Sequence, residues 1–577
     1  MQRSFDLDPV APPSQIGSLE DLITKARETV KNRWRTAVFD EVQKEIADWL
    51  PLIAKDVQGK KILEVLTNPE LLETKLSIRQ FSDLDVLRNV HSQAWYSLVR
   101  ASMERQNAEL AVLSEWTDTL SPSVFERLGT TKDGFALALE IAQKTGSLVN
   151  ETFMQQMKFA DMPHGSEQTP HTSAMGAEFI YEVRQKDGTY KLVPYIEMFP
   201  ATWPTLVQTI QALSQKTLQL VSEHRVPPEY TALSQYLSTV ASVYGSRETD
   251  FSRLYTLWHG LEDAVQTYFQ SECPIVLSTQ AYSYVTGDAG KADAEFRVAI
   301  ETQKTKAYEY MLLPYQKIAE KFARVFDRSL SKPSIPITVR FQEMLYGTGS
   351  NTFWRTQGES SEKIIDIYVD SGEDVARHMA IPIYERVFGK QLDTRAKEIF
   401  VRNYVESLAV HELGHTVLSD TDESVKSRVG QGVGFSMIEE LKADTVGMKI
   451  FWERMKNTWD MDHAKRMLEM LVTYSLEYIL NRTSFDGHGT SMYGDGGTMI
   501  LSHLLNAGAL KKSARGTYEI QDAAKGFSAL VAVAEYICVL YADPQTTPDR
   551  IEQYAKYLKK HKENPKFQEL LAFAKVK

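Results

Sequence analysis

Two short segments in the C-terminal part of this chain bring together residue types that bind a transition metal. Residues 411–415 read H-E-L-G-H, and residues 439–444 read E-E-L-K-A-D. If residues 399–419 form a helix, His411 and His415 lie one turn apart on the same face, where both imidazoles can reach one ion. The H-E-x-x-H spacing is typical of catalytic zinc sites. We therefore predict a single Zn²⁺ ion with His411 and His415 among its ligands.

Glu412 lies beside this pair, but its direction from the helix axis differs from that of His411 by about 100°. Its carboxylate is therefore expected to face the open coordination position of the ion instead of binding it. Zinc lowers the pKa of a bound water to ~7, and a nearby carboxylate can take the proton as that water attacks a peptide carbonyl. Glu412 is thus the predicted general base.

Catalytic zinc usually has three protein ligands, so one more is required. The longer pattern with a third histidine would need Gly at Leu418 and His at Thr421, and neither is present. We predict Glu440 as the third ligand, because residues 435–452 have helical patterning. Three acids that follow the expected helix end remain alternatives, namely Asp420, Asp422 and Glu423.

Two further carboxylates are predicted to support the ligands. Asp444 lies one turn beyond Glu440 on the same helix face, where it can accept the remaining N–H of a ligating histidine. Glu439 is assigned the same supporting role. Such carboxylates fix the tautomer and the orientation of an imidazole ring.

The order of these motifs resembles that of the gluzincin metallopeptidases, and the E-E-x-x-A-D segment is most similar to the dipeptidyl-peptidase III family. The resemblance implies the same roles, with His411, His415 and Glu440 as zinc ligands, Glu412 as base and Asp444 as the supporting acid. It covers roughly residues 399–542. Family members carry one extra residue between the histidines, H-E-x-x-x-H, whereas this chain has the regular spacing.

A later segment, residues 493–510, is similar to a family stretch that begins with His-Gly and ends in a Leu-Leu, Gly-Ala turn. In the family that histidine is thought to stabilise the oxyanion of the reaction. Tyr493 occupies the aligned position here, and His488 lies about a turn away. Either side chain can donate the hydrogen bond that this role needs, so both remain candidates.

The composition places limits on class and compartment. Of the 577 residues, 43% are hydrophobic and 24% charged, as in soluble globular proteins. The net charge of -11 argues against a nucleic-acid partner and against binding to anionic membranes. Two distant cysteines, Cys273 and Cys538, exclude a disulfide framework. The sequence has no signal peptide or uninterrupted apolar run of membrane-spanning length, so we expect a cytoplasmic protein.

The patterning predicts a mainly α protein with small β elements (α+β). Residues 19–159 and 204–328 have helical spacing of apolar residues. A hairpin is expected over residues 177–184 and 189–197, around Asp187-Gly188, and further strands over residues 335–346 and 363–370. Residues 364–369 are either an edge strand that pairs with an extended substrate or a purely structural strand.

We predict two lobes, with a zincin-like helical catalytic domain and the active-site cleft between the lobes. The expected divisions are an N-terminal helical region (1–160), a hairpin plus helical region (161–330) and a zinc metallopeptidase domain (331–577).

The predicted function is zinc-dependent hydrolysis of peptide bonds in short peptides, by an exopeptidase resembling dipeptidyl peptidase III. The expected partner is the peptide substrate, and the oligomeric state is left open. Three alternatives remain: a gluzincin aminopeptidase or endopeptidase, a zinc hydrolase of another amide, and a non-catalytic scaffold protein that keeps zinc for stability.

Overall fold

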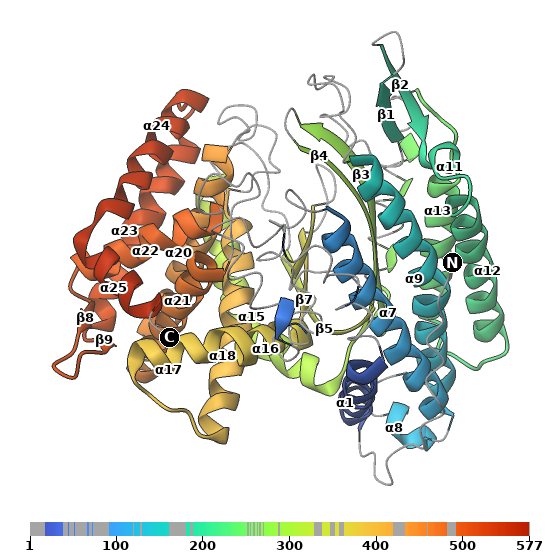
Figure 1. Ribbon diagram of the computed structural model, residues 1–577, viewed down its shortest axis with the longest axis horizontal. Helices are drawn as coiled ribbons and strands as arrows, with labels where there is room; N and C mark the ends of the chain where they lie inside the picture. Colours follow the sequence, from blue (N-terminus) through green and yellow to red (C-terminus); the bar gives the residue numbers. More distant parts are fainter. Residues whose placement is uncertain are drawn as a thin grey trace. The chain divides into compact units, whose positions relative to one another are not determined.

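A computed structural model describes the protein over residues 18–37, 44, 51, 66–68, 72, 92–118, 120–126, 130–160, 180–184, 189–250, 253, 256–257, 260–261, 264, 267–268, 270–286, 289–327, 337–346, 352–356, 363–418, 433–458, 460–481 and 492–575. Within these ranges the chain is mainly helical with small β elements, which confirms the predicted fold class (Figure 1). The chain divides into two compact units. The cleft between lobes and the three-part division stay predictions.

The first unit comprises the described residues of Met1–Arg79, His91–Lys304 and Gln342–Gly349. Helix α12 packs along α13 and α9, and α9 packs along α7. The Trp203 and Tyr244 rings stack with their centroids 4.9 Å apart, and the Trp203 indole donates a hydrogen bond to the Tyr244 carbonyl. The helices are α1 (Leu19–Ala37), α7 (Ser92–Thr117), α8 (Pro122–Glu126), α9 (Lys132–Ala160), α11 (Tyr195–Met198), α12 (Trp203–Ser222) and α13 (Tyr230–Tyr244).

Two hairpins belong to this unit. Strand β1 (Ile180–Arg184) pairs antiparallel with β2 (Tyr190–Pro194), which confirms the first predicted hairpin; Asp187 and Gly188 lie outside the described residues. Strand β3 (Ile275–Thr286) pairs antiparallel with β4 (Ala289–Ile300) along its whole length. The C-terminal part of β5 (Ile337–Tyr346) pairs with the end of β4.

The second hairpin corrects the sequence analysis, which expected helices throughout residues 204–328. That prediction is wrong for residues 275–300. Strand β3 is rich in β-branched and aromatic residues, which favour an extended, pleated backbone. The sequence between the strands, Gly287-Asp288, is also of the kind that two-residue hairpin loops prefer.

The second unit comprises the described residues of Thr305–Phe341 and Ser350–Lys577, and it holds both metal-binding motifs. Helix α20 is its centre, because α20 contacts α18, α21, α22, α23 and α24 (Figure 1). The helices are α15 (Gln303–Asp327), α16 (Val369–Val375), η1 (Ala376–Ala380), α17 (Ile381–Phe388), α18 (Thr394–His415), α20 (Val433–Thr458), α21 (Met461–Asn481), α22 (Met492–Asn506), α23 (Ala523–Ala542), α24 (Pro548–Lys559), η2 (Lys560–Glu563) and α25 (Pro565–Lys575).

The strands of this unit confirm the second predicted β region. Strand β5 (Ile337–Tyr346) begins in this unit, and the strand order here is β5-β7-β6, with β7 (Lys363–Tyr368) in the middle and β6 (Thr352–Thr356) beside it. The suggestion that residues 364–369 form an edge strand for a substrate is wrong, because β7 has a hydrogen-bonded neighbour on each side. Strands β8 (Leu510–Lys512) and β9 (Tyr518–Ile520) form a separate hairpin.

Helices α18 and α20 approach so closely that their backbones touch. A Cβ atom at Gly414 of α18 would overlap the carbonyl of Ala443 on α20. A Cβ atom at Gly447 of α20 would lie 2.5 Å from the carbonyl oxygen of Val410 on α18. Gly414 follows Val410 on α18, but its partner Ala443 precedes Gly447 on α20. The two helices therefore run antiparallel. Both contacts require glycine, because only a residue without a Cβ atom fits there.

Among the described residues, α23 is the one helix long and apolar enough to cross a membrane by length and composition. Half of its apolar window is buried inside the protein, and α23 packs against α20, α21 and α22. Phe527, Leu530 and Ile537 are buried, whereas Tyr536 and Val539 are exposed. Core helices of soluble proteins have the same length and composition, and the packing of α23 fits that role.

The close crossing predicts that Gly447→Ala destabilises the protein by about 2 kcal/mol or more, because the added methyl meets backbone that cannot move aside without separating the helices. The control is Gly260→Ala, where a Cβ would meet nothing within 4 Å. Gly260 is helical and exposed, so alanine there is expected to stabilise the protein by about 0.5 kcal/mol. Denaturant unfolding of both variants measures the difference, and equal stability of the two would contradict the proposed contact.

Candidate metal centre

The first motif lies at the C-terminal end of α18. The helix begins earlier than expected because the side chain of Asp393 caps it, accepting a hydrogen bond from the Ala396 backbone at 2.8 Å. It ends at His415 instead of continuing to residue 419. Leu418 then adopts a left-handed backbone conformation with φ of 49°, which is uncommon for a residue other than glycine.

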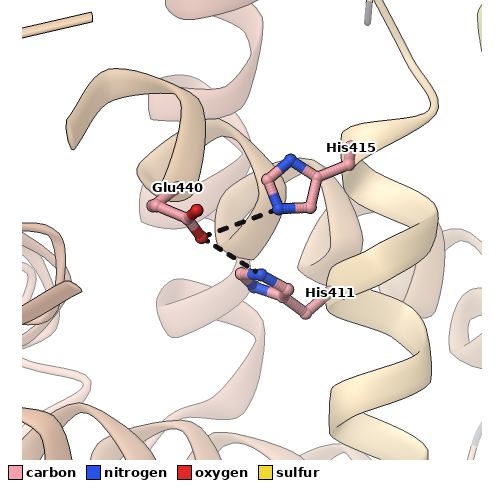
Figure 2. Close-up of side chains that lie close together, drawn as sticks. All are labelled: His411, His415 and Glu440. Carbon is pink, nitrogen blue, oxygen red and sulfur yellow. Dashed lines mark ion pairs between the residues drawn. The ribbon is translucent and has the colours of Figure 1, made fainter. Parts of the chain in front are cut away.

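Both histidines point toward Glu440 on α20, as Figure 2 shows. The Nε2 atom of His411 lies 3.4 Å from Oε2 of Glu440, and the Nε2 atom of His415 lies 3.6 Å from the same oxygen. All three side chains are largely withdrawn from solvent. The structure thus brings together the three residues that the sequence predicts as metal ligands.

The predicted supporting carboxylates contact the Nδ1 atom of each imidazole, whereas Glu440 lies near the Nε2 atoms. Oδ1 of Asp444 is 2.7 Å from Nδ1 of His411, and Oε1 of Glu439 is 3.2 Å from Nδ1 of His415. Ionised carboxylates only accept hydrogen bonds, so each Nδ1 atom carries the proton. When the rings are neutral, as metal binding requires, their Nε2 lone pairs are therefore directed at the same space beside Glu440.

This arrangement fits a zinc ion. Two donor atoms about 2.1 Å from an ion in tetrahedral geometry lie about 3.4 Å from each other. The separations of Glu440 Oε2 from the two Nε2 atoms are close to that value, and the three ligand atoms lie within 4.8 Å of one another. Oε2 of Glu440 is also buried without a hydrogen bond, which is costly for a carboxylate oxygen unless a cation binds it. Two imidazoles and one carboxylate are a common ligand set of catalytic zinc.

The electrostatics of the cluster favour positive charge at its centre. Burial by itself lowers the pKa of His411, but Asp444, Glu440 and Glu412 outweigh this effect and hold that pKa well above its ordinary value. Burial also opposes the charge on His415, yet Glu440 and Glu439 raise its pKa to about 10.

The pKa of the Glu440 carboxyl shifts in the complementary direction. Burial acts to raise it, but the two histidines lower it well below its ordinary value. The carboxylates that raise the pKa values of the two histidines would also attract a divalent cation placed between the Nε2 atoms.

Glu412, the predicted base, is also buried on α18, with 8% of its surface exposed. Its charge is one of those that raise the pKa of His411, so the carboxylate lies close to the centre without being one of the three converging groups. That Glu412 faces the open side of the ion stays a prediction.

The other predicted residues are less well placed by the structure. Tyr493 lies in the first turn of α22, but its side chain lies outside the described residues. His488 is also outside them, as are the three alternative ligands Asp420, Asp422 and Glu423. The choice between Tyr493 and His488 therefore stays open.

The structure also adds two residues that the sequence analysis missed. The ammonium group of Lys442 is fully buried and lies 2.7 Å from Oε1 of Glu439. The Tyr474 ring on α21 packs beside His411 with a centroid distance of 6.4 Å, and its hydroxyl lies 2.7 Å from that of Tyr478. Burial, together with the charges of Tyr478 and Asp444, raises the pKa of Tyr474 well above its ordinary value, so its hydroxyl keeps its proton. For Lys442, the one available sequence signal was the presence of a lysine within the apolar stretch after Glu440.

The structural relatives found by comparison with known proteins include two that are named for the family that the motifs resemble. One is dipeptidyl-peptidase III from Corallococcus sp. strain EGB, with 15% identity, a TM-score of 0.49, and coverage of 70% of this chain and 75% of that chain. The other is DPP III from Caldithrix abyssi, with 13% identity, a TM-score of 0.47, and coverage of 82% of this chain and 93% of that chain. No family model and no curated protein matches the sequence. Likeness of this degree does not establish a shared activity, so function rests on the site itself.

The geometry predicts that the wild-type protein binds one Zn²⁺ ion per chain and that Glu440→Gln weakens this binding at least tenfold, because an amide oxygen is a neutral and weaker donor. Glu453→Gln is the matched control, since Glu453 lies on the same helix and pairs with Lys456 at 2.8 Å. Zinc content after dialysis and a Co²⁺ titration measure the effect. Equal metal binding by the wild-type protein and Glu440→Gln would show that Glu440 is not a ligand.

Proposed function

We propose that this protein is a zinc-dependent peptidase that hydrolyses peptide bonds in short peptides. The observation that carries the proposal is the convergence of His411, His415 and Glu440 on one point, with Glu412 buried beside them. Two histidines and a glutamate from neighbouring helices, together with an additional carboxylate, are the groups that such a hydrolase requires. We propose the cytoplasm as its compartment.

Each residue has a distinct part in the proposed reaction. His411, His415 and Glu440 would hold the ion, which supplies a positive centre that polarises a peptide carbonyl and makes water more acidic. The Glu412 carboxylate accepts a proton from the attacking water and later delivers it to the leaving amine. Asp444 and Glu439 keep the protons on the Nδ1 atoms and hold the two rings in place.

The developing oxyanion needs a hydrogen-bond donor in addition to the ion. We propose Tyr493 or His488 for this role, on the resemblance of residues 493–510 to the family stretch. The backbone of Tyr493 lies at the start of α22, a helix that contacts α20, which carries Glu440.

We propose an exopeptidase that releases dipeptides from a free N-terminus. This finer assignment rests on the motif resemblance. An aminopeptidase, an endopeptidase and a scaffold protein with structural zinc are the outcomes that the two experiments below would reveal.

Glu412→Gln is expected to retain zinc and to lose turnover by a factor of about 10² to 10⁴, because the amide cannot accept the proton. Glu398→Gln is the control, since Glu398 lies on the same helix, is exposed and pairs with Arg377. Hydrolysis of a short-peptide library and zinc content are measured together. Unchanged turnover in Glu412→Gln would remove this residue as the base, and a zinc-loaded wild-type protein without any hydrolysis would support the scaffold alternative.

The predicted exopeptidase specificity has its own test. Peptides with a free N-terminus are expected to be cut after the second residue, whereas the same peptides with an acetylated N-terminus should be cut at least a hundredfold more slowly, because a recognised ammonium group is then absent. Mass spectrometry of the products reports the bond that is cut. Equal cleavage of free and blocked peptides would indicate an endopeptidase, and release of single residues an aminopeptidase.

A further inference from the structure

Lys442 is an unusual residue for the interior of a protein. It lies on α20 between the ligand Glu440 and the supporting acid Asp444, and its side chain has no exposed surface. A buried ammonium group is costly unless each of its three N–H donors has an acceptor. Lys442 has three such acceptors: Glu439 Oε1 at 2.7 Å, the Val417 carbonyl at 2.8 Å and the Leu418 carbonyl at 2.7 Å. It also lies 5.3 Å from the ring centroid of Tyr541.

The first of these contacts leads directly to a histidine of the metal centre. Oε1 of Glu439 lies 2.7 Å from Nζ of Lys442 and 3.2 Å from Nδ1 of His415. The same oxygen therefore accepts from both groups. Lys442 holds the carboxylate in the position from which it orients the His415 ring.

The other two contacts fix the backbone beside the same histidine. His415 is the last residue of α18, and Val417 and Leu418 follow it. Carbonyls at the end of a helix lack intrahelical partners and carry partial negative charge, so a cation binds them well. The bond to Leu418 also holds that residue in its left-handed conformation.

We propose that Lys442 is a positioning residue of the metal centre, which holds His415 in its metal-binding orientation through the Glu439 carboxylate on one side and the end of α18 on the other. The inference rests on the proposed function, because it takes His415 as a ligand. Lys442 does not touch the metal position itself. It acts as the fixed cation that keeps ring and helix end aligned.

Helix α20 provides a matched comparison. Lys449 lies two turns after Lys442, pairs with Glu535 at 2.6 Å and lies 5.2 Å from the ring centroid of Phe322. It thus has the same kinds of partner as Lys442, a carboxylate and an aromatic ring. Its carboxylate partner, Glu535, is exposed and lies on α23, so removing the charge of Lys449 tests the loss of a lysine from α20 away from His415.

The experiment compares Lys442→Met and Lys449→Met in the full-length protein by Co²⁺ titration, with Zn²⁺ affinity measured by competition against a chelator. Lys442→Met is expected to weaken Zn²⁺ binding 10- to 100-fold, the usual effect of losing a partner that orients a ligand. Lys449→Met should remain within threefold of the wild-type protein. An unchanged affinity in Lys442→Met would overturn the inference.

A double-variant cycle tests whether Lys442 acts through Glu439. Glu439→Gln alone should weaken Zn²⁺ binding, and adding Lys442→Met to it should cost much less than Lys442→Met costs in the wild-type background. If the fold-losses in Zn²⁺ affinity of the two single variants simply multiply in the double variant, Lys442 does not act through Glu439. If Lys442→Met does not fold, Lys442→Gln with Lys449→Gln as control replaces it, with the same expected results.

The metal measurements separate this inference from the proposed function. A wild-type protein that binds neither Co²⁺ nor Zn²⁺ would overturn both. Normal wild-type binding with no effect of Lys442→Met would overturn only the positioning role. Metal binding without peptide hydrolysis would overturn the peptidase proposal and leave the role of Lys442 in place.

Discussion

The contact between the backbones of α18 and α20 is the constraint on which the candidate site depends. Gly414 and Gly447 let the two helices meet without intervening side chains. Because the helices run antiparallel, His411 and His415 face Asp444 and Glu440 across this contact. Side chains as short as these can reach one point only when their helices lie this close. The distances of 3.4 and 3.6 Å between the imidazoles and Glu440 are therefore a property of the helix crossing as much as of the three residues.

The crossing also concentrates charge in a buried place, and the fold has to balance it. Three carboxylates of α20 and one of α18 lie around two imidazoles, and their mutual effects appear as raised histidine pKa values and lowered pKa values of Glu439 and Glu440. Within the described residues, Lys442 is the lysine that balances Glu439, at the same oxygen that His415 contacts. A buried charge network of this kind contributes little net stability by itself, and its main effect is to fix the positions of its members. Such fixed positions are what a metal centre requires.

The sequence was sufficient for the parts of the structure that follow from local periodicity. The spacing of His411 and His415 and the helical pattern around Glu440 predicted which residues converge, since an α-helix fixes which side chains share a face. The exact ends of α18 were not predictable, because they depend on the Asp393 cap and on Lys442, a residue of another helix. Strands β3 and β4 were missed because the helical spacing of residues 204–328 was extended across them, despite the β-branched and aromatic residues of β3. The central position of β7 in its sheet depends on which strands lie beside it, which the sequence does not reveal.

Gly414, the fourth residue of H-E-L-G-H, also limits how this motif can change length. One residue inserted between the histidines would rotate His415 by about 100° around α18, away from Glu440, unless the helix formed a local bulge. An insertion before Gly414 would also move this glycine out of contact with Ala443. As long as α18 stays regular, a change of length that keeps this crossing intact is therefore expected in the connections outside it, where it does not change which faces of the helices meet.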